Sequence, residues 1–290
     1  MKTFSFSLFL LFFLSSSSTL FAQSKNIAEG VKQYEDGRYE DAIAELDIAL
    51  ESAGNLKAKA LAKAHYYRAA SQITFLRRMV SWENLPEAMA EKVQRYALTA
   101  AADLKAVRKN DTDKKYSSEM KNWERKSQKI LLGLGKLAMT EGNKPGMEDA
   151  ARKKRFEAAL ELGQAGAGLD KFYYAPYNLM GDAALALEDG ASALKYYRLA
   201  DDTFFRSAPK DGDLSIAYTY MHIAELEKSL NKDMAAAEKA LTKGQEQLNG
   251  EHKKIQVFSN RRPEEKAALD RLYQDINEEL ARVAARVRGK

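Results

Sequence analysis

Histidine is the side chain best suited to acid–base chemistry and to metal binding near neutral pH, and the sequence contains three, at positions 65, 222 and 252. No pair of histidines, and no histidine with a carboxylate, has the spacing that metal sites use. His65 and His222 lie beside aromatic and small residues on segments that we expect to be helical, which favours packed structural histidines. We therefore predict no metal site and no cofactor.

The sequence also lacks the nucleophiles and loops of familiar enzymes. It contains no cysteine, which excludes disulfides and thiolate chemistry, and it has no Gly-x-Ser-x-Gly turn. The stretch from Gly163 to Gly168 has no Lys-Ser/Thr ending for a phosphate loop, and we interpret it as a flexible turn between repeats. Carboxylates are abundant, but at solvent-facing helix positions they give no argument for a glycosidase pair. We predict that the protein is not an enzyme.

The first 22 residues have the layout of a secretory signal peptide. Lys2 precedes an apolar run from Phe4 to Leu14, and a serine-rich stretch then leads to Leu-Phe-Ala, with expected cleavage after Ala22. An uncleaved anchor is the alternative, but the run is shorter than the roughly 20 residues that a membrane span needs. We expect an exported protein that is periplasmic or associated with the outer membrane. The end of the segment resembles signal peptides of Bacteroidetes.

The composition is that of a globular protein, with 30% charged and 45% apolar residues. Only five prolines interrupt the chain, which is typical of long helices with few irregular loops. The 46 basic and 41 acidic residues are interspersed and give a net charge of +5, so the surface is not suited to a polyanion. We expect no nucleic-acid partner and, after signal cleavage, no segment that crosses a bilayer.

Residues 26–51 predict two short helices that form a hairpin. Apolar residues share one face of the first helix up to Tyr34, and Gly37 can end that helix in the left-handed conformation. The second helix carries Ala42, Leu46 and Ala49 at helical spacing. Small residues at positions 30, 42 and 49 let two antiparallel helices approach closely.

This hairpin resembles a tetratricopeptide repeat (TPR), a unit of 34 residues with small residues at fixed positions in two helices. A second stretch, which begins at Tyr177, has the same register, and a weaker third one contains Tyr220, Ala224, Ala236 and Ala240, with Lys243 at the last small position. The residues that define the two better repeats are Gly30, Gly37, Tyr39, Ala42 and Ala49 in the first, and Tyr177, Gly181, Ala193, Tyr197 and Ala200 in the second.

The intervening segments predict further helices at 56–79, 85–108, 114–141 and 146–163, with a last one from about 263 to 287. The resemblance implies an all-α fold: a right-handed superhelical solenoid of about five antiparallel helix hairpins plus a C-terminal capping helix. The expected domains are a signal peptide at 1–22, an irregular solenoid at 23–250, a linker at 251–262 and the capping helix at 263–290. Residues 255–258, within the linker, read as briefly strand-like.

In TPR proteins the first helix of each unit lines a concave groove. Lysine and asparagine at fixed places form a clamp for terminal carboxylates in this family, and Val31 stands where asparagine would be needed, so the clamp is not supported. For Tyr66 and Met139, the alternative prediction is a buried position between helices instead of a position in the groove. The groove residues implied by the resemblance are Tyr34, Lys63, Tyr66, Lys136, Met139, Asn178, Asp182, Tyr218, Met221 and Glu225.

The signal-like segment, the repeat register and the missing catalytic groups together predict a non-catalytic scaffold or adaptor of the cell envelope that holds a segment of a partner protein. Such a partner would belong to the envelope, as in a secretion, assembly or motility apparatus. The first alternative is a binding module for an envelope polymer or small ligand, such as peptidoglycan fragments, with tyrosines as stacking platforms. The second is an enzyme with an unfamiliar site among those tyrosines. The sequence does not set the oligomeric state.

Overall fold

The computed structural model describes residues 22–51, 54, 56–79, 86–207, 212–257 and 262–289. The predicted signal peptide, apart from Ala22, lies outside the described residues. Within the described ranges all regular structure is helical, which confirms the all-α prediction. Residues 22–35 form the first helix. It is followed by α2 (Tyr39–Glu51), α3 (Ala58–Arg78), α4 (Glu87–Asn110), α5 (Ser117–Gly142), α6 (Asp149–Leu169), α7 (Ala175–Ala186), α8 (Gly190–Ser207), α9 (Ile216–Leu226), the π-helical turn η2 (Glu227–Asn231), α10 (Met234–Val257) and α11 (Pro263–Arg288).

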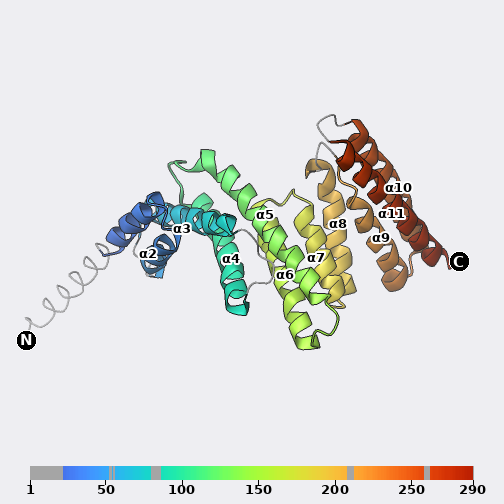
Figure 1. Cartoon of the computed structure of the whole chain (residues 1–290), viewed down its shortest axis with the longest axis horizontal. Helices are drawn as coiled ribbons and strands as arrows, with labels where there is room; N and C mark the ends of the chain where they lie inside the picture. The colour runs from blue at the N-terminus through green and yellow to red at the C-terminus, as the bar shows by residue number, and fades with distance from the viewer. Residues whose placement is uncertain are drawn as a thin grey trace, which may run out of the picture. The chain divides into compact units, whose positions relative to one another are not determined.

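The helices pair as consecutive hairpins: 22–35 with α2, α3 with α4, α5 with α6, α7 with α8, and α9 with α10 (Figure 1). The described chain thus contains the predicted five hairpins and the additional helix α11. The chain divides into two compact units, residues 1–134 and residues 135–290, which we call unit 1 and unit 2. Helix α5 begins in unit 1 and ends in unit 2. No helix in the described ranges combines the length and the apolar character that a bilayer crossing requires.

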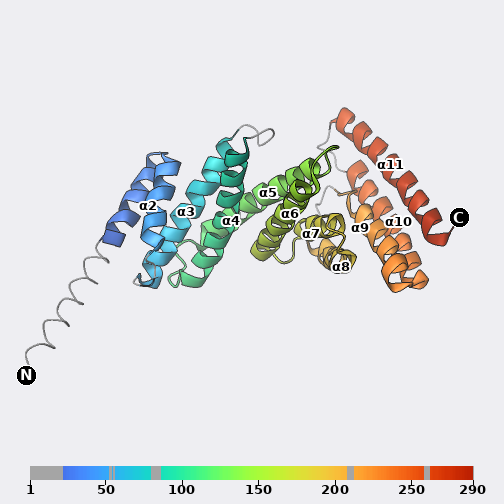
Figure 2. The same ribbon diagram turned by 90° about the horizontal axis from the view of Figure 1, so that it is seen from below.

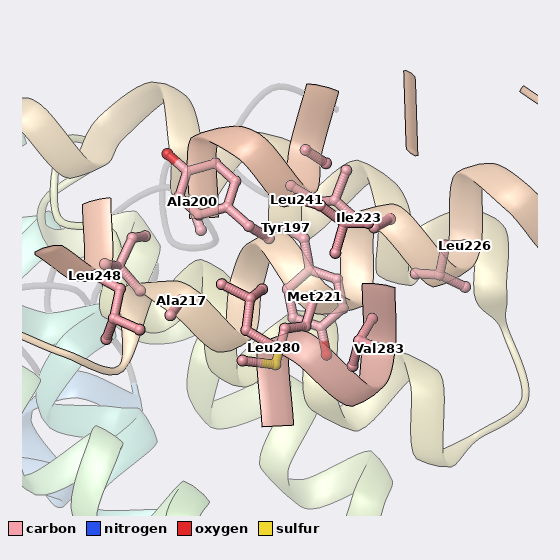
Figure 3. Packing of buried hydrophobic residues seen from close by; sticks show 14 of the residues in the cluster. Tyr197, Ala200, Ala217, Met221, Ile223, Leu226, Leu241, Leu248, Leu280 and Val283 are labelled. Atoms are coloured by element: carbon pink, nitrogen blue, oxygen red, sulfur yellow. The ribbon is translucent and has the colours of Figure 1, made fainter. Parts of the chain in front are cut away.

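Unit 2 is held together by a core that runs through α8, α9, α10 and α11. Tyr197, Met221 and Leu248 are buried in it, and Leu280 of α11 packs into the same cluster (Figure 3). Helix α11 packs against both α9 and α10 (Figure 2). Because α11 contributes four buried apolar residues on one stripe, it shields the apolar surface of the preceding hairpin.

Unit 1 has an apolar core in which a charged network is embedded. The guanidinium of Arg68 on α3 donates to both carboxylate oxygens of Asp103 on α4, with both N–O distances 2.8 Å. His65 Nδ1 lies 2.7 Å from Asp103 Oδ1, and Arg68 also donates to Asp47 of α2 over 2.6 Å. The Asp103 side chain is 2% exposed, whereas that of Asp47 is 48% exposed. The network therefore joins three helices around one buried carboxylate.

The turns of two hairpins place a left-handed residue at the same distance from a small residue of the first helix. Gly37 has φ +78°, seven residues after the small residue Gly30. Glu188 has φ +62°, seven residues after Gly181, so a residue with a side chain occupies the place of a turn glycine. A left-handed conformation is strained for any residue with a Cβ atom.

We therefore expect the substitution Glu188→Gly to stabilise unit 2 by about 1 kcal/mol, since it removes left-handed strain at an exposed position. Urea unfolding followed by circular dichroism measures this change. The matched control is Asp189→Gly at the next residue, whose side chain caps the backbone N–H of Ser192 over 3.0 Å, and this substitution should destabilise. If the urea concentration at the midpoint of unfolding is unchanged or lower for Glu188→Gly, the left-handed conformation of Glu188 is not a source of strain.

The hairpin of α9 and α10 contains one residue more than the two hairpins that turn at Gly37 and Glu188. Its left-handed residue is Lys232, with φ +56°, eight residues after Ala224. The extra residue is accommodated in η2, because a π-helical turn holds one residue more than an α-helical turn. The predicted register is therefore wrong by one residue after this turn. Ala237 and Gly244 are the buried small residues, in place of Ala236 and Lys243.

Two predicted irregular segments are helical. The glycines of 163–168, which were expected to form a turn, lie inside α6. A Cβ atom on Gly163 would come within 2.7 Å of Met180 Cγ, so glycine at this position permits close packing of α6 against α7.

The predicted linker at 251–262 and its strand-like part are wrong for residues 251–257, which continue α10. Ile255 is buried there, and buried Glu251 accepts a bond from the backbone N–H of Asp213 over 2.9 Å, so tertiary contacts extend the helix.

Candidate functional site

The first helices of the hairpins in unit 2 bring together many of the predicted groove residues. The Thr219 hydroxyl of α9 donates to Asn178 Oδ1 of α7 over 2.8 Å. The Tyr197 hydroxyl donates to Asp182 Oδ1 over 2.7 Å, and its ring stacks on His222 with a centroid distance of 5.0 Å. We use the name unit 2 face for the residues Lys136, Met139, Asn178, Asp182, Tyr218, His222 and Glu225.

Charges of both signs interact across the unit 2 face. Part of Asp182 remains in contact with water, but desolvation raises the pKa of its carboxyl group. The hydrogen bond from Tyr197 and the positive charges of His222 and Lys136 lower this pKa and oppose the shift. Helix α11 adds a further cation, because Arg286 donates to Glu225 over 2.8 Å. The face therefore presents paired charges around side chains that remain accessible to a partner.

A hollow of about 310 Å³ lies beside the unit 2 face, between α7, α9, η2 and α11. Its walls combine apolar side chains with His222, for which no hydrogen-bond partner is found among the described residues. Such a mixture of apolar walls and a few polar groups is typical of a site that receives a side chain or small ligand. The lining residues are Leu185, His222, Glu225, Leu226, Lys228, Ser229, Arg286 and Val287.

Unit 1 carries an aromatic cluster from three separate elements. Tyr34 comes from the helix at 22–35, Tyr66 and Tyr67 from α3, and Tyr116 from the residue before α5. The ring centroids of Tyr34 and Tyr67 are 5.4 Å apart, those of Tyr66 and Tyr67 are 5.2 Å apart, and those of Tyr66 and Tyr116 are 4.2 Å apart. We call these four residues the tyrosine surface.

The buried part of the tyrosine surface is fixed by hydrogen bonds. Trp123 Nε1 donates to the Tyr66 hydroxyl over 3.2 Å, and that hydroxyl donates to the Glu119 carboxylate. Burial raises the pKa of Tyr116 to about 12 and raises that of Tyr34 and Tyr67 as well. All of these hydroxyls are therefore protonated at neutral pH, and each is able to donate a hydrogen bond.

The described residues contain no group of three or more histidine, aspartate or glutamate side chains placed to hold a metal ion. Two histidines instead have structural surroundings: His65 contacts Asp103, and His252 contacts Asp270 over 2.7 Å and stacks on Tyr273. His222 is the histidine that borders the hollow.

Small residues lie where the two helices of a hairpin contact each other. A Cβ atom on Gly30 would lie 2.6 Å from Leu46 Cγ, and one on Gly181 would lie 2.5 Å from Tyr197 Cε1, so each glycine lets the two helices of its hairpin meet. The alanines expected in the second helices are fully buried: Ala42, Ala49, Ala193 and Ala200. These contacts follow the TPR register. The chain has a TPR-like fold.

No protein-family model matches the sequence, and no curated protein matches it. Among solved structures, the chain is similar to the TPR protein TTC0263 of Thermus thermophilus, at 14% identity over 91% of this chain and 99% of that chain, with a TM-score of 0.34. It is also similar to the assembly chaperone of RpL4 (Acl4), at 15% identity. That match covers 91% of this chain and 99% of the chaperone chain, with a TM-score of 0.38. A third similar structure is the TPR2AB domain of yeast Sti1 in its pHSP90 complex, at 15% identity. That match covers 89% of this chain and 98% of the Sti1 chain, with a TM-score of 0.27.

The TPR-like hairpins leave most of the predicted groove residues at the surface. Tyr66 and Met221 are the exceptions, because they are only 6% and 2% exposed and pack in the interior. A partner cannot contact them directly, and their neighbours Tyr67 and His222 take the accessible positions. Contact of the remaining residues with a partner stays a prediction. They are Tyr34, Lys63, Lys136, Met139, Asn178, Asp182, Tyr218 and Glu225.

Sequence reasoning missed three residues that contribute to these surfaces. Tyr67 and His222 each follow a predicted groove residue directly, so a one-residue error in helix register accounts for both. Arg286 belongs to α11, which was expected only to cap the array. The hydrophobic stripe of α11 gave the signal that it packs against α9, but the pairing of Arg286 with Glu225 depends on the packing of the two helices.

Proposed function

We propose that this protein is a non-catalytic scaffold that holds a segment of a partner protein on the first helices of its TPR-like hairpins. The observation that carries the proposal is the unit 2 face. Residues from α5, α7 and α9 meet there, with charges of both signs, the exposed ring of Tyr218 and an adjacent hollow of about 310 Å³. Protein-binding surfaces commonly combine aromatic anchors with a polar rim.

The partner that we propose is a protein of the cell envelope. This part of the proposal rests on the signal-like sequence of residues 1–22, which lies almost wholly outside the described residues. An exported scaffold without catalytic groups would serve an assembly in which its partner is another exported or membrane-bound protein. The stacking of a glycan on tyrosines is the competing outcome of the experiment below.

A photo-reactive residue at position 218 tests the proposal, because Tyr218 is 40% exposed on the unit 2 face. Irradiation of living cells should give one dominant protein adduct, which mass spectrometry identifies. The matched control places the same residue at position 205, where Phe205 is 66% exposed on the second helix α8. Adducts with glycan, or equal protein adducts from both positions, would contradict the proposal.

A further inference from the structure

A small hollow in unit 1 lies beside the tyrosine surface, between the first turns of α3 and the segment that joins α4 to α5. Its volume is about 50 Å³. One water molecule needs about 10–15 Å³, so the hollow can hold a few waters or one small polar group, but no sugar or aromatic ring. Its lining includes Lys59 and Lys63 of α3 and, from the joining segment, Asp111, Asp113, Lys115 and Tyr116.

Both aspartates of the hollow already have partners. The carboxylate of Asp111 accepts hydrogen bonds from the backbone N–H groups of Lys115 and Tyr116, over 3.0 and 2.9 Å. Asp113 Oδ2 lies 3.0 Å from Lys59 Nζ, and the hydrogen bond from Lys59 lowers the pKa of the Asp113 carboxyl group. Asp111 therefore fixes the backbone that carries Lys115 and Tyr116, and Asp113 neutralises one lysine.

Two lysines of the hollow remain without a counter-ion. No ion pair is found for Lys63 or Lys115 among the described residues. The three lysines and two aspartates of the lining leave one positive charge in excess. A carboxylate carries the single negative charge that balances this excess, whereas a phosphorylated side chain carries about 1.5–2 negative charges at pH 7. The charge of the lining therefore favours a carboxylate.

Tyr116 adds a buried hydrogen-bond donor to the hollow. The residue is 7% exposed, and its ring stacks on Tyr66 with a centroid distance of 4.2 Å. No hydrogen bond of the Tyr116 hydroxyl is found to any described residue. Burial raises the pKa of this hydroxyl to about 12, and Tyr67 and Asp111 add to the effect. The hydroxyl therefore keeps its proton, and an acceptor in the hollow would satisfy a donor that is costly to bury alone.

We propose that this hollow binds the carboxylate of one acidic side chain in a protein segment. The proposal rests on the function as a protein-binding scaffold and names the group that unit 1 recognises. The carboxylate oxygens accept hydrogen bonds from the ammonium groups of Lys63 and Lys115 and from the Tyr116 hydroxyl. A carboxylate has about four acceptor sites, so these three donors can all be used. The donor set differs from the lysine and asparagine clamp for terminal carboxylates.

Nuclear magnetic resonance of the full chain labelled with ¹⁵N tests this proposal, with acetate as the probe. At constant ionic strength, acetate should shift the amide signals of Lys63, Lys115 and Tyr116 in a saturable manner, with a dissociation constant in the millimolar range. A peptide with blocked ends and one internal glutamate should shift the same signals. The matching peptide with glutamine in place of glutamate should not shift them.

Matched variants separate the contributions. Tyr116→Phe keeps the ring in its stack on Tyr66 and should weaken acetate binding about tenfold, since a hydrogen bond to a charged group is lost. Its control is Tyr67→Phe, which removes a hydroxyl outside the lining of the hollow and should leave the affinity unchanged. Lys63→Gln should weaken binding by a similar factor. Lys32→Gln, at an exposed lysine of the first helix, should not change it.

The inference is overturned if acetate and the glutamate peptide give no saturable shift at these residues, or if Tyr116→Phe binds acetate as tightly as the native chain. Inorganic phosphate that binds there more tightly than acetate would also overturn it and assign the hollow to a phosphoryl group. These failures are distinct from failure of the scaffold function. A specific protein adduct at position 218 would leave that function supported without any carboxylate binding in unit 1.

Discussion

Replacement of Asp103 by alanine is expected to lower the free energy of unfolding of unit 1 by about 3–5 kcal/mol. The side chain is 2% exposed and accepts two hydrogen bonds from Arg68 and a contact from His65. Its removal leaves the Arg68 guanidinium, itself 15% exposed, without its main counter-charge. A charge that stays buried after its partner is lost is strongly destabilising.

The control for this prediction is Asp47→Ala, which removes the other carboxylate bound to the same guanidinium. Asp47 is 48% exposed, so water replaces the lost contact, and the cost should be about 1 kcal/mol or less. Both tryptophans, Trp82 and Trp123, fall within residues 1–134, so tryptophan fluorescence during urea unfolding reports on unit 1. Equal losses for the two variants would show that burial of Asp103 does not set the stability of the network.

Substitution of Gly181 by alanine is expected to destabilise unit 2 by about 1–3 kcal/mol. The new Cβ would lie 2.5 Å from Tyr197 Cε1, and the Tyr197 ring is held in the core and by its hydrogen bond to Asp182. A rigid buried ring can move only with its neighbours, so an added methyl group forces the two helices of the hairpin apart.

The same substitution at Gly250 provides a control with the opposite sign. Gly250 lies inside α10, and a Cβ built on it meets nothing within 4 Å. Alanine should therefore stabilise α10 by about 0.5–1 kcal/mol, because it lowers the entropy cost of forming the helix. Circular dichroism during urea unfolding measures both variants. A stabilising effect of Gly181→Ala would refute the close approach of the two helices.

The hairpins could be predicted from the sequence because small residues at helix contacts leave a local signature. Gly30 and Gly37, like Gly181 and the turn at Glu188, stand at the spacing that two packed helices require. Positions of this kind depend on one hairpin alone, so short-range pattern is sufficient to find them. The register error after η2 arose because a π-helical turn adds a residue without any strong mark in the sequence.

The candidate surfaces were less accessible to prediction. The choice between Tyr66 and Tyr67 depends on the rotation of α3 about its axis, and adjacent aromatic residues give no signal for this rotation. The network around Asp103 also joins helices that are distant in sequence. One signal was available: Asp103 lies between Ala100 and Val107 on the buried stripe of α4, and a carboxylate at such a position requires a cation.

The extra residue in η2 shows how this architecture tolerates a change of length. The widened turn ends at the left-handed Lys232, and the spacing from that residue to Ala237, Leu241 and Gly244 equals the spacing that follows Gly37 in the first hairpin. An insertion before the turn is thus confined to one helix end and does not displace the contacts of the next helix. Repeats of unequal length can accumulate in one chain for this reason, while each hairpin keeps the same interior.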